Sequence, residues 1–414
     1  MVQNFRLNCK AFQSDLYTPA MNRNQIPLIV SLHQSLLLIL TLMIFSCSDK
    51  VAAQLPKKTY KWDEFVMGAD LSYVNQVEDY GGVYKDGGKQ ADPFEIFRNH
   101  GANVVRVRLW HTPKWVADLN NGKYYYDLAG TEQTIRRAKQ AGMAVNLDIH
   151  YSDTWADPDH QEIPAAWKNL NLGQMKDSVY QYTLQVLNYL KSKNLVPEMV
   201  QVGNENNNGM LWPTGKVSGN NFNAFAQLLN SGIKAVRDFS ATSEIKPKII
   251  LHVAQIQFAD YWAKRIVQYG VTDFDILGLS HYTKWSTVQS MQAVSDSIRQ
   301  LVARFGKTVM VVETAYPWTG DNADSYNNIF SAADVAPGYG ISKEDQLRYM
   351  RDLTQAIIKG GGKGIMYWEP AWISSRLNDG WGVGSSWENN AYFDFSGSLL
   401  PVADFMSEVY TFPK

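Results

Sequence analysis

The feature that most constrains the fold of this chain is an eightfold alternation of short apolar runs with longer amphipathic stretches. The runs are "FVMGADLS" (65–72), "NVVRVRLW" (103–110), "MAVNLDIH" (143–150), "EMVQVGNE" (198–205), "KIILHV" (248–253), "FDILGLSHY" (274–282), "TVMVVET" (308–314) and "GIMYWEP" (364–370). Helix-like stretches lie between them at 131–141, 174–193, 222–239, 259–269, 287–305 and 343–359. Near-continuous apolar runs indicate strands covered on both faces. The alternation therefore predicts an α/β protein whose residues 60–414 form a single (β/α)8 TIM barrel.

An export leader is expected before the barrel. Residues 36–45, "LLLILTLMIF", are too short to cross a bilayer but suit the apolar region of a signal peptide. They run into "IFSC", which resembles a bacterial lipobox ending at Cys47. We expect a signal or lipoprotein leader over 1–46 and a linker over 47–59. The alternative is an ordinary signal cleaved near Ala52 and Ala53.

These signals predict an exported protein. We expect an outer-membrane or cell-surface lipoprotein, or otherwise a periplasmic or secreted protein, with membrane attachment only through a lipidated Cys47.

Composition excludes several functional classes. The formal net charge of −1 offers no basic field for nucleic acid. The two cysteines, Cys9 and Cys47, precede the barrel, which therefore has neither a disulfide nor a thiol nucleophile. The chain has 13 Trp and 22 Tyr, which either fill a large core or provide stacking surfaces for sugars. We expect a monomer without nucleic-acid partners or an organic cofactor.

Polar or aromatic side chains follow most of the apolar runs. They are Asp70, Arg108, Asp148, His150, Asn204, Glu205, His252, His281, Tyr282, Glu313, Trp368 and Glu369. Any one of them could be a cap or a loop residue. In a barrel, however, the carboxyl ends of all strands meet at one mouth, where barrel enzymes build their active sites.

Two glutamates in this set suit glycoside hydrolysis. Glu205 lies in "VQVGNENNNGMLWP" after the fourth run, and Glu313 ends the seventh. Carboxylates on facing strand ends would lie about 5 Å apart, which predicts hydrolysis with retention of anomeric configuration. We expect Tyr282 and Arg108 to keep Glu313 ionised and Asn204 to bind a sugar hydroxyl. The alternative is a chance pair of strand-end acids.

Several segments resemble glycoside hydrolase family 53, the arabinogalactan endo-β-1,4-galactanases of clan A. They are "MGADLSY" (67–73), "VRVRLW" (105–110), "AGMAVNLDIHYSDTWADP" (141–158), "QVGNENNNGMLWP" (201–213), "VVETAYPWT" (311–319) and "GIMYWEPAWI" (364–373). The resemblance covers about 60–408. It implies that Glu205 is the proton donor and Glu313 the nucleophile.

The resemblance also implies residues that bind the sugar chain. Trp368 would form the floor under the cleaved sugar. The walls would come from Trp155, Trp318, Trp372, Asp148, His150, Asp153, His281 and Tyr282. The chain departs from the family at Asn206, where an Ile is frequent, at Ala254, where an Asp is frequent, and at His281, where a Tyr is common.

A structural calcium ion is a further expectation from this family resemblance. The segment "GDNADSYNN" (320–328) is rich in the oxygen ligands that calcium prefers. The expected ligands are Asp321, Asp324, Asn328, Ser385 and Glu388. The alternative is a solvated loop rich in Asn and Asp.

The sequence thus predicts an endo-β-1,4-galactanase acting on galactan or arabinogalactan. The alternatives are another retaining glycosidase of clan A, such as a mannanase or a β-glucanase, and a catalytically silent glycan-binding lipoprotein of the cell surface.

Overall fold

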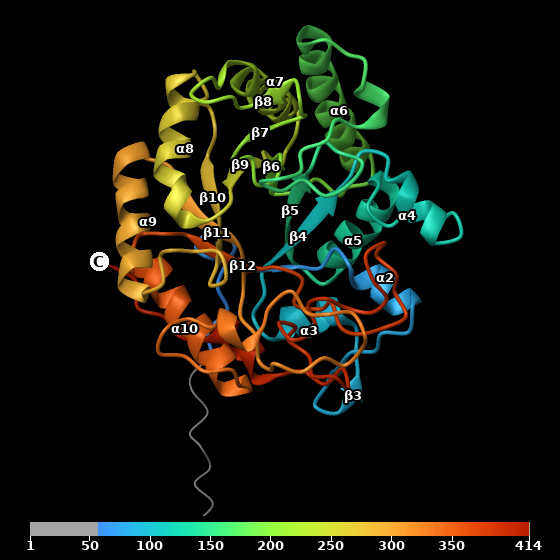
Figure 1. Ribbon diagram of the computed structural model, residues 1–414, viewed down its shortest axis with the longest axis vertical. Coiled ribbons are helices and arrows are strands. Elements are labelled where there is room, and N and C mark those ends of the chain that lie inside the picture. The colour runs from blue at the N-terminus through green and yellow to red at the C-terminus, as the bar shows by residue number, and fades with distance from the viewer. Residues whose placement is uncertain (1–56, 414) are drawn as a thin grey trace, which may run out of the picture. The chain divides into compact units, whose positions relative to one another are not determined.

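Eight parallel strands close into a barrel in this computed structural model, which describes residues 57–413 (Figure 1). The strands are β1 (Val66–Asp70), β4 (Val104–Leu109), β5 (Ala144–Ile149), β6 (Met199–Val202), β9 (Lys248–Val253), β10 (Ile276–Tyr282), β11 (Thr308–Ala315) and β12 (Gly364–Tyr367). Each strand pairs with the next along the chain, and the pairing of β1 with both β12 and β4 closes the ring. The predicted TIM barrel is confirmed, and all eight expected strands are present.

Helices surround the strands in chain order (Figure 1). The long ones are α5 (Leu128–Gln140), α6 (Leu172–Ser192), α7 (Asn223–Ser240), α8 (Ile256–Gln268), α9 (Met291–Phe305) and α10 (Lys343–Lys359). The shorter ones are α2 (Val74–Asp79), α3 (Pro93–Asn99) and α4 (Lys114–Leu119), with 3₁₀ turns η1 (Ala165–Trp167), η2 (Ala332–Asp334) and η3 (Pro401–Ser407). Two small hairpins lie in the loops: β2 (Lys85–Asp86) with β3 (Lys89–Gln90), and β7 (Gly209–Met210) with β8 (Gly215–Lys216).

Local sequence signals set the limits of several helices. Asn171 caps α6 in a reciprocal box with Gln174, and the side chain of Ser290 caps α9. Helix α9 ends at Gly306, whose φ of 62° is the left-handed conformation that glycine adopts without strain. The short α2, α3 and α4 were not predicted, because six or seven residues show little helical periodicity.

The predicted leader, residues 1–46, and the lipidation of Cys47 lie outside the described residues and stay predictions. No helix of the described part of the chain is both long and apolar enough to cross a membrane.

A cluster of apolar side chains, called the plug below, fills the barrel interior at the end opposite the mouth. Its side chains come from every strand: Val66, Val104, Ala144, Met199, Ile250, Ile276, Met310, Val312 and Met366. A larger apolar cluster lies between the strands and the helices. Because side chains alternate along a strand, the interior positions above the plug belong to residues two and four places further on. These are the positions that build the mouth of the barrel.

The plug predicts a local stability effect. Ile250→Ala removes buried methyl groups that the surrounding strands cannot fill, so we expect a loss of about 2–5 kcal/mol in the free energy of unfolding. Ile245→Ala is the matched control, since 39% of this side chain is exposed, and should change it by less than about 0.5 kcal/mol. Urea unfolding followed by circular dichroism measures both, and equal effects would contradict the layer assignment.

Candidate active site

The interior of the barrel changes from apolar to polar along β4. Val104 belongs to the apolar plug, Arg106 lies one interior position above it, and Arg108 lies one above that. Both arginines are almost fully buried, with 1% and 2% of their surfaces exposed. A buried cation is stable only when it is paired and hydrogen-bonded, so the surroundings of each arginine decide its role.

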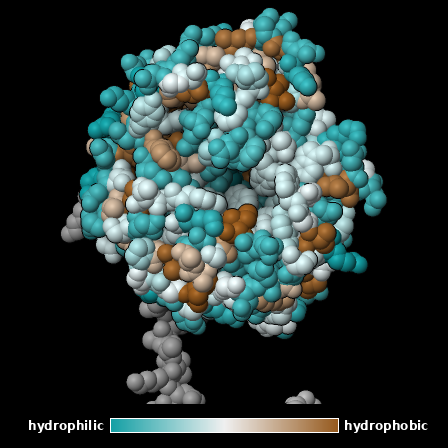
Figure 2. Space-filling view, in the orientation of Figure 1, coloured by the Kyte–Doolittle hydropathy of each residue, from teal (hydrophilic) through white to brown (hydrophobic). Residues whose placement is uncertain are grey.

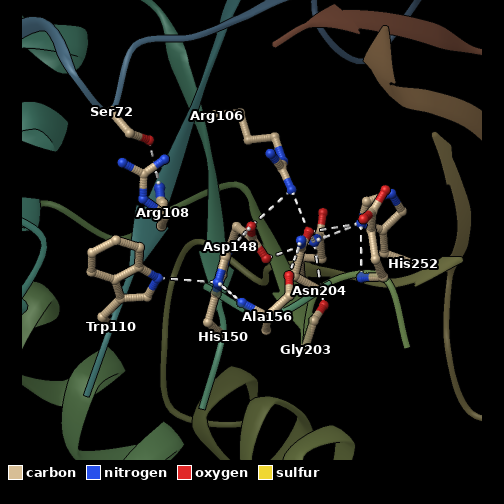
Figure 3. Close-up of polar contacts among 12 residues, drawn as sticks. Ser72, Arg106, Arg108, Trp110, Asp148, His150, Ala156, Gly203, Asn204 and His252 are labelled. Atoms are coloured by element: carbon tan, nitrogen blue, oxygen red, sulfur yellow. Dashed lines mark hydrogen bonds and ion pairs between the residues drawn. The ribbon is translucent and has the colours of Figure 1, made fainter. Parts of the chain in front are cut away.

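Arg106 is the central cation of the barrel mouth (Figure 3). Its guanidinium nitrogens lie 2.8 Å from Asp70, 2.8 Å from Asp148 and 2.7 Å from Glu313. It also donates to the amide oxygen of Asn204 at 2.7 Å. One cation therefore connects strands β1, β5 and β11 with the residues that follow β6.

A β-bulge turns Glu313 into the barrel. Leu279 of β10 is paired with Val311 of β11, but the next pair is Ser280 with Glu313, so that Val312 is passed over. Val312 packs in the plug, and Glu313 also reaches an interior group, Arg106. Two successive residues thus face inward, which regular alternation forbids and a bulge permits. The hydroxyl of Tyr282 donates to the other oxygen of Glu313 at 2.9 Å.

Glu205 leaves β6 through a strained turn. Gly203 has φ 80°, and a Cβ built there would lie 2.3 Å from the amide nitrogen of Asn206. Glu205 itself has φ 44°, a left-handed conformation that is uncommon for a residue with a side chain and that recurs at functional sites. Its carboxyl oxygen Oε1 accepts a hydrogen bond from Ser280. The turn presents the carboxyl group to the cavity instead of to the helix layer.

The two glutamates lie close together. One carboxyl oxygen of each, together with one ring nitrogen of His252, lie within 4.8 Å of one another. Three such atoms could approach a metal ion, but Glu313 is already paired with the Arg106 cation. The arrangement fits a pair of acids better than a metal centre.

The acids differ in their tendency to ionise. Burial raises the pKa of Glu313 to about 7, against the opposing effects of Arg106 and the Tyr282 hydroxyl. Burial, followed by the charge of Glu313, raises the pKa of Glu205 well above its ordinary value. Glu313 therefore ionises first, and its charge helps to keep the proton on Glu205.

A cavity of about 810 Å³ opens over both acids, and Figure 2 shows the hollow near the centre of this face. Aromatic side chains dominate its walls: Trp155, Tyr282, Trp368, Trp372 and Trp387. Three exposed aromatic residues stand on its rim, with Trp381 62%, Phe258 52% and Trp285 46% exposed. An apolar cleft with a few convergent polar groups is typical of a ligand site.

Most of the predicted catalytic and substrate-binding residues border this cavity. They are His150, Trp155, Asn204, Glu205, Tyr282, Glu313, Trp368 and Trp372. Asp148 lies below its floor, where it is fully buried and binds Arg106, Gln201 and His150. Asp148 supports the mouth and does not face a ligand.

Three further predicted binding residues, besides Asp148, do not line the cavity. His281 lies between Ser280 and Tyr282, which both face the interior, so its side chain faces the helix layer, where it is buried. Asp153 joins two loops by accepting from the backbone nitrogens of Thr112 and Ala165. Trp318 donates to the Glu388 carbonyl and packs on Phe395 at 5.0 Å.

Arg106, and not the predicted Arg108, is the arginine that pairs with Glu313. Arg108 pairs with Glu369, 3.1 Å away. Arg106 and Arg108 are two residues apart and face the same side, so the sequence did not show which of them lies level with Glu313.

Sequence reasoning missed Arg106, Ser280 and the rim residues Phe258, Trp285 and Trp381. Ser280 had a usable signal, because it lies two residues before Tyr282 and therefore on the same face of β10. The rim residues had no usable signal in the sequence, since their exposure depends on loop conformation.

The five predicted calcium ligands gather only in part. Asp324 accepts from the backbone nitrogen of Ser385 at 2.9 Å, and the nearby charge of Asp324 helps burial to raise the pKa of Glu388 to about 7. Asn328 contacts the backbone carbonyl of Asp321 at 3.3 Å. Among the described residues, Glu388 Oε2 and Asn328 Oδ1 are buried without a hydrogen-bond partner.

Comparison with known proteins gives a consistent result. The chain is 44% identical over 351 residues to an arabinogalactan endo-β-1,4-galactanase of Cellvibrio japonicus, covering 84% of this chain and 91% of that protein. It is 33% identical over 341 residues to one of Thermothelomyces thermophilus, covering 80% and 96%.

Two solved structures are also similar to this chain. The Ignisphaera aggregans GH53 catalytic domain matches with a TM-score of 0.77 at 36% identity, covering 86% of this chain and 99% of that one. A structure of fungal β-1,4-galactanases matches with a TM-score of 0.69 at 31% identity, covering 82% and 98%. The family model of glycosyl hydrolase family 53 matches residues 66–406. With this match over most of its length, the chain belongs to glycosyl hydrolase family 53.

Proposed function

We propose that this protein is an endo-β-1,4-galactanase that hydrolyses galactan or arabinogalactan with retention of anomeric configuration, Glu205 being the acid/base and Glu313 the nucleophile. The observation that carries the proposal is the pair of carboxyl oxygens within 4.8 Å of each other. This spacing suits direct attack on the sugar, because inverting enzymes hold their carboxyl groups about 6.5–9.5 Å apart to admit a water molecule.

The reaction has two steps. Glu313 attacks the anomeric carbon while Glu205 gives its proton to the leaving oxygen, so the glycosidic bond breaks and a glycosyl ester forms. Glu205, now a carboxylate, then takes a proton from water, whose oxygen attacks the anomeric carbon and releases Glu313. Arg106 and Tyr282 favour the anionic form of Glu313 that both begins and ends the cycle.

Two features support the binding of a sugar chain. Exposed aromatic side chains stand on the rim of the cavity, and aromatic faces stack on sugar rings. Asn204 lines the cavity and gives one amide hydrogen to the Ala156 carbonyl, which leaves the second for a substrate hydroxyl. The choice of galactan over mannan or glucan rests on the names of the relatives.

Substitution of the two acids tests the proposal. We expect Glu313→Gln to abolish the release of reducing ends from β-1,4-galactan and Glu205→Gln to slow it by about 10²–10⁴-fold, since each removes one partner of the reaction. Proton NMR should show the β-anomer as the first product of the wild type.

Exposed Glu344→Gln is the matched control and should keep full activity. An α-anomer as first product would contradict retention. Faster hydrolysis of mannan or β-glucan would favour another clan A activity, and galactan binding without turnover by the wild type would favour a glycan-binding protein.

The pH profile tests the protonation states. The hydroxyl of Tyr282 stabilises ionised Glu313, so Tyr282→Phe should raise the pKa of Glu313 further. Because activity needs ionised Glu313 and is lost as pH falls through its pKa, the acidic limb of kcat/KM should move to higher pH. A hydrogen bond to a charged group contributes about 1.5–3 kcal/mol, which corresponds to a shift of about one to two pH units.

Tyr151→Phe is the matched control for this shift. Tyr151 is equally buried, but its hydroxyl contacts Thr183. An unchanged acidic limb in Tyr282→Phe would remove Tyr282 from the mechanism.

We also propose that the loops after β11 and β12 hold a structural calcium ion. Glu388 Oε2 and Asn328 Oδ1 are oxygen atoms of the kind that calcium prefers, and both lack a partner among the described residues. The carboxylate of Asp324 adds negative charge beside Glu388. Glu388, Asp324 and Asn328 would hold the ion, which would join the two loops without taking part in the chemistry.

Calcium should raise the thermal unfolding temperature of the chelator-treated protein, and more at pH 8 than at pH 6. The reason is that protons compete with the ion for Glu388, whose pKa is raised to about 7. Glu388→Gln should abolish the response, while Glu344→Gln should keep it. Differential scanning fluorimetry measures the shift, and a wild type that ignores calcium at both pH values would exclude the site.

A further inference from the structure

Strand β10 supplies one hydroxyl group to each glutamate. Ser280 and Tyr282 lie two residues apart and face the barrel interior; Tyr282 donates to Glu313, and Ser280 donates to Glu205 Oε1. Ser280 is fully buried, so its hydroxyl has only protein partners. The two-step reaction above does not use this serine.

His252 lies on the other side of Ser280. Its ring atom Nε2 is 2.9 Å from Ser280 Oγ. Burial, and then the charge of Arg106, lower the pKa of His252 well below its ordinary value, so the ring is neutral and carries one hydrogen. The position of that hydrogen decides the direction of both hydrogen bonds.

The surroundings of His252 Nδ1 place the hydrogen on Nε2. Nδ1 faces two N–H donors, the backbone nitrogen of Glu205 at 3.4 Å and Gln201 Nε2 at 3.1 Å. Gln201 cannot be reversed, because its oxygen would then lie 2.6 Å from Asp148 Oδ1. Asn204 Oδ1 lies nearest to Nδ1, at 2.9 Å, but its two lone pairs accept from Arg106 at 2.7 Å and from Gln201 at 3.0 Å, and the backbone N–H of Glu205, which cannot be reversed, is directed at Nδ1. Nδ1 therefore accepts, and Nε2–H donates to Ser280.

A donor chain thus runs from His252 through Ser280 to Glu205 Oε1. Since Oε1 receives the hydrogen of Ser280, a proton on Glu205 has to reside on Oε2. The reverse chain would put the Glu205 proton on Oε1, directed at Ser280 and away from a substrate.

We propose that Ser280, oriented by His252, is a positioning residue that keeps the catalytic proton of Glu205 on Oε2, from which it passes to the leaving oxygen. This inference rests on the proposed function. In the first step the proton moves from Oε2 to the leaving oxygen. In the second step Oε2 takes a proton from water, while the Ser280 hydroxyl stabilises the charge on Oε1.

Leaving-group dependence separates this role from a purely structural one. Galactan leaves as a sugar alkoxide and needs the proton, whereas a dinitrophenyl β-galactobioside leaves as a stable phenolate and does not. We expect Ser280→Ala to lower kcat/KM on galactan by about tenfold or more, part of the about 10²–10⁴-fold of general acid catalysis, and to change kcat/KM on the aryl substrate by less than about twofold. kcat/KM is the relevant constant because it reports the first step.

The pH profile gives an independent measurement. Ser280 lowers the pKa of Glu205 by donating to it, so its removal should move the alkaline limb of kcat/KM on galactan to higher pH. Ser280→Thr keeps a hydroxyl and should restore part of the galactan activity. Ser295→Ala is the matched control, since Ser295 is also fully buried but lies on α9.

Equal losses on both substrates, or no loss on galactan, would overturn the proposal. Circular dichroism of Ser280→Ala identifies a folding defect, and in that case Ser280→Thr provides the comparison: unequal effects on the two substrates support the role and equal effects exclude it. Failure of the proposed function differs from all of these, because the wild type itself would then cleave neither substrate.

Discussion

The ion pairs of Arg106 set the electrostatics of the whole barrel mouth. A single guanidinium group lies within 2.8 Å of Asp70, Asp148 and Glu313, so one positive charge faces three carboxylates. A further anion nearby is unfavourable in this buried setting. Burial and then the charge of Glu313 favour the protonated form of Glu205, whereas Arg106 favours the ionised form of Glu313, so the two acids differ in their tendency to ionise.

Three residues that follow barrel strands adopt a strained backbone conformation. Glu205, Gln255 and Glu369 follow β6, β9 and β12, and all three have positive φ values of 44°, 61° and 46°. Each such residue costs about 1–3 kcal/mol and persists only where the surroundings fix it. The closed barrel, with its packed plug, provides that rigidity, because neighbouring strands on both sides hold each strand end. The bulge beside Glu313 is likewise a local distortion of the backbone, and it turns this carboxyl group into the barrel.

The barrel and the position of both glutamates at its mouth could be predicted from the sequence, because those features depend on local pattern. Apolar runs mark strands, and an acid at a strand end points to the mouth whatever the loops do. Sequence reasoning exchanged Arg106 for Arg108 because periodicity gives the face of a strand but not the depth in the barrel. It placed the adjacent residues His281 and Tyr282 both in the cavity, although neighbouring residues of a strand face opposite sides, and the structure turns Ser280 and Tyr282 inward and His281 outward. Depth and register are properties of strand pairs, which one run of residues does not encode.

The depth difference between the two arginines explains why the chain has both. Arg106 balances charge at the level of the acids, whereas Arg108 pairs with Glu369 and lies against aromatic faces, 4.2 Å from the ring of Trp155 and 4.7 Å from that of Tyr73. Such contacts orient the rings and fix them before a sugar arrives. A wall that is already ordered loses little conformational entropy on binding, so more of the stacking energy remains to hold the substrate. Arg106 thus balances the charge of Glu313 and Arg108 orders the aromatic wall of the cleft, although the two are separated by a single residue.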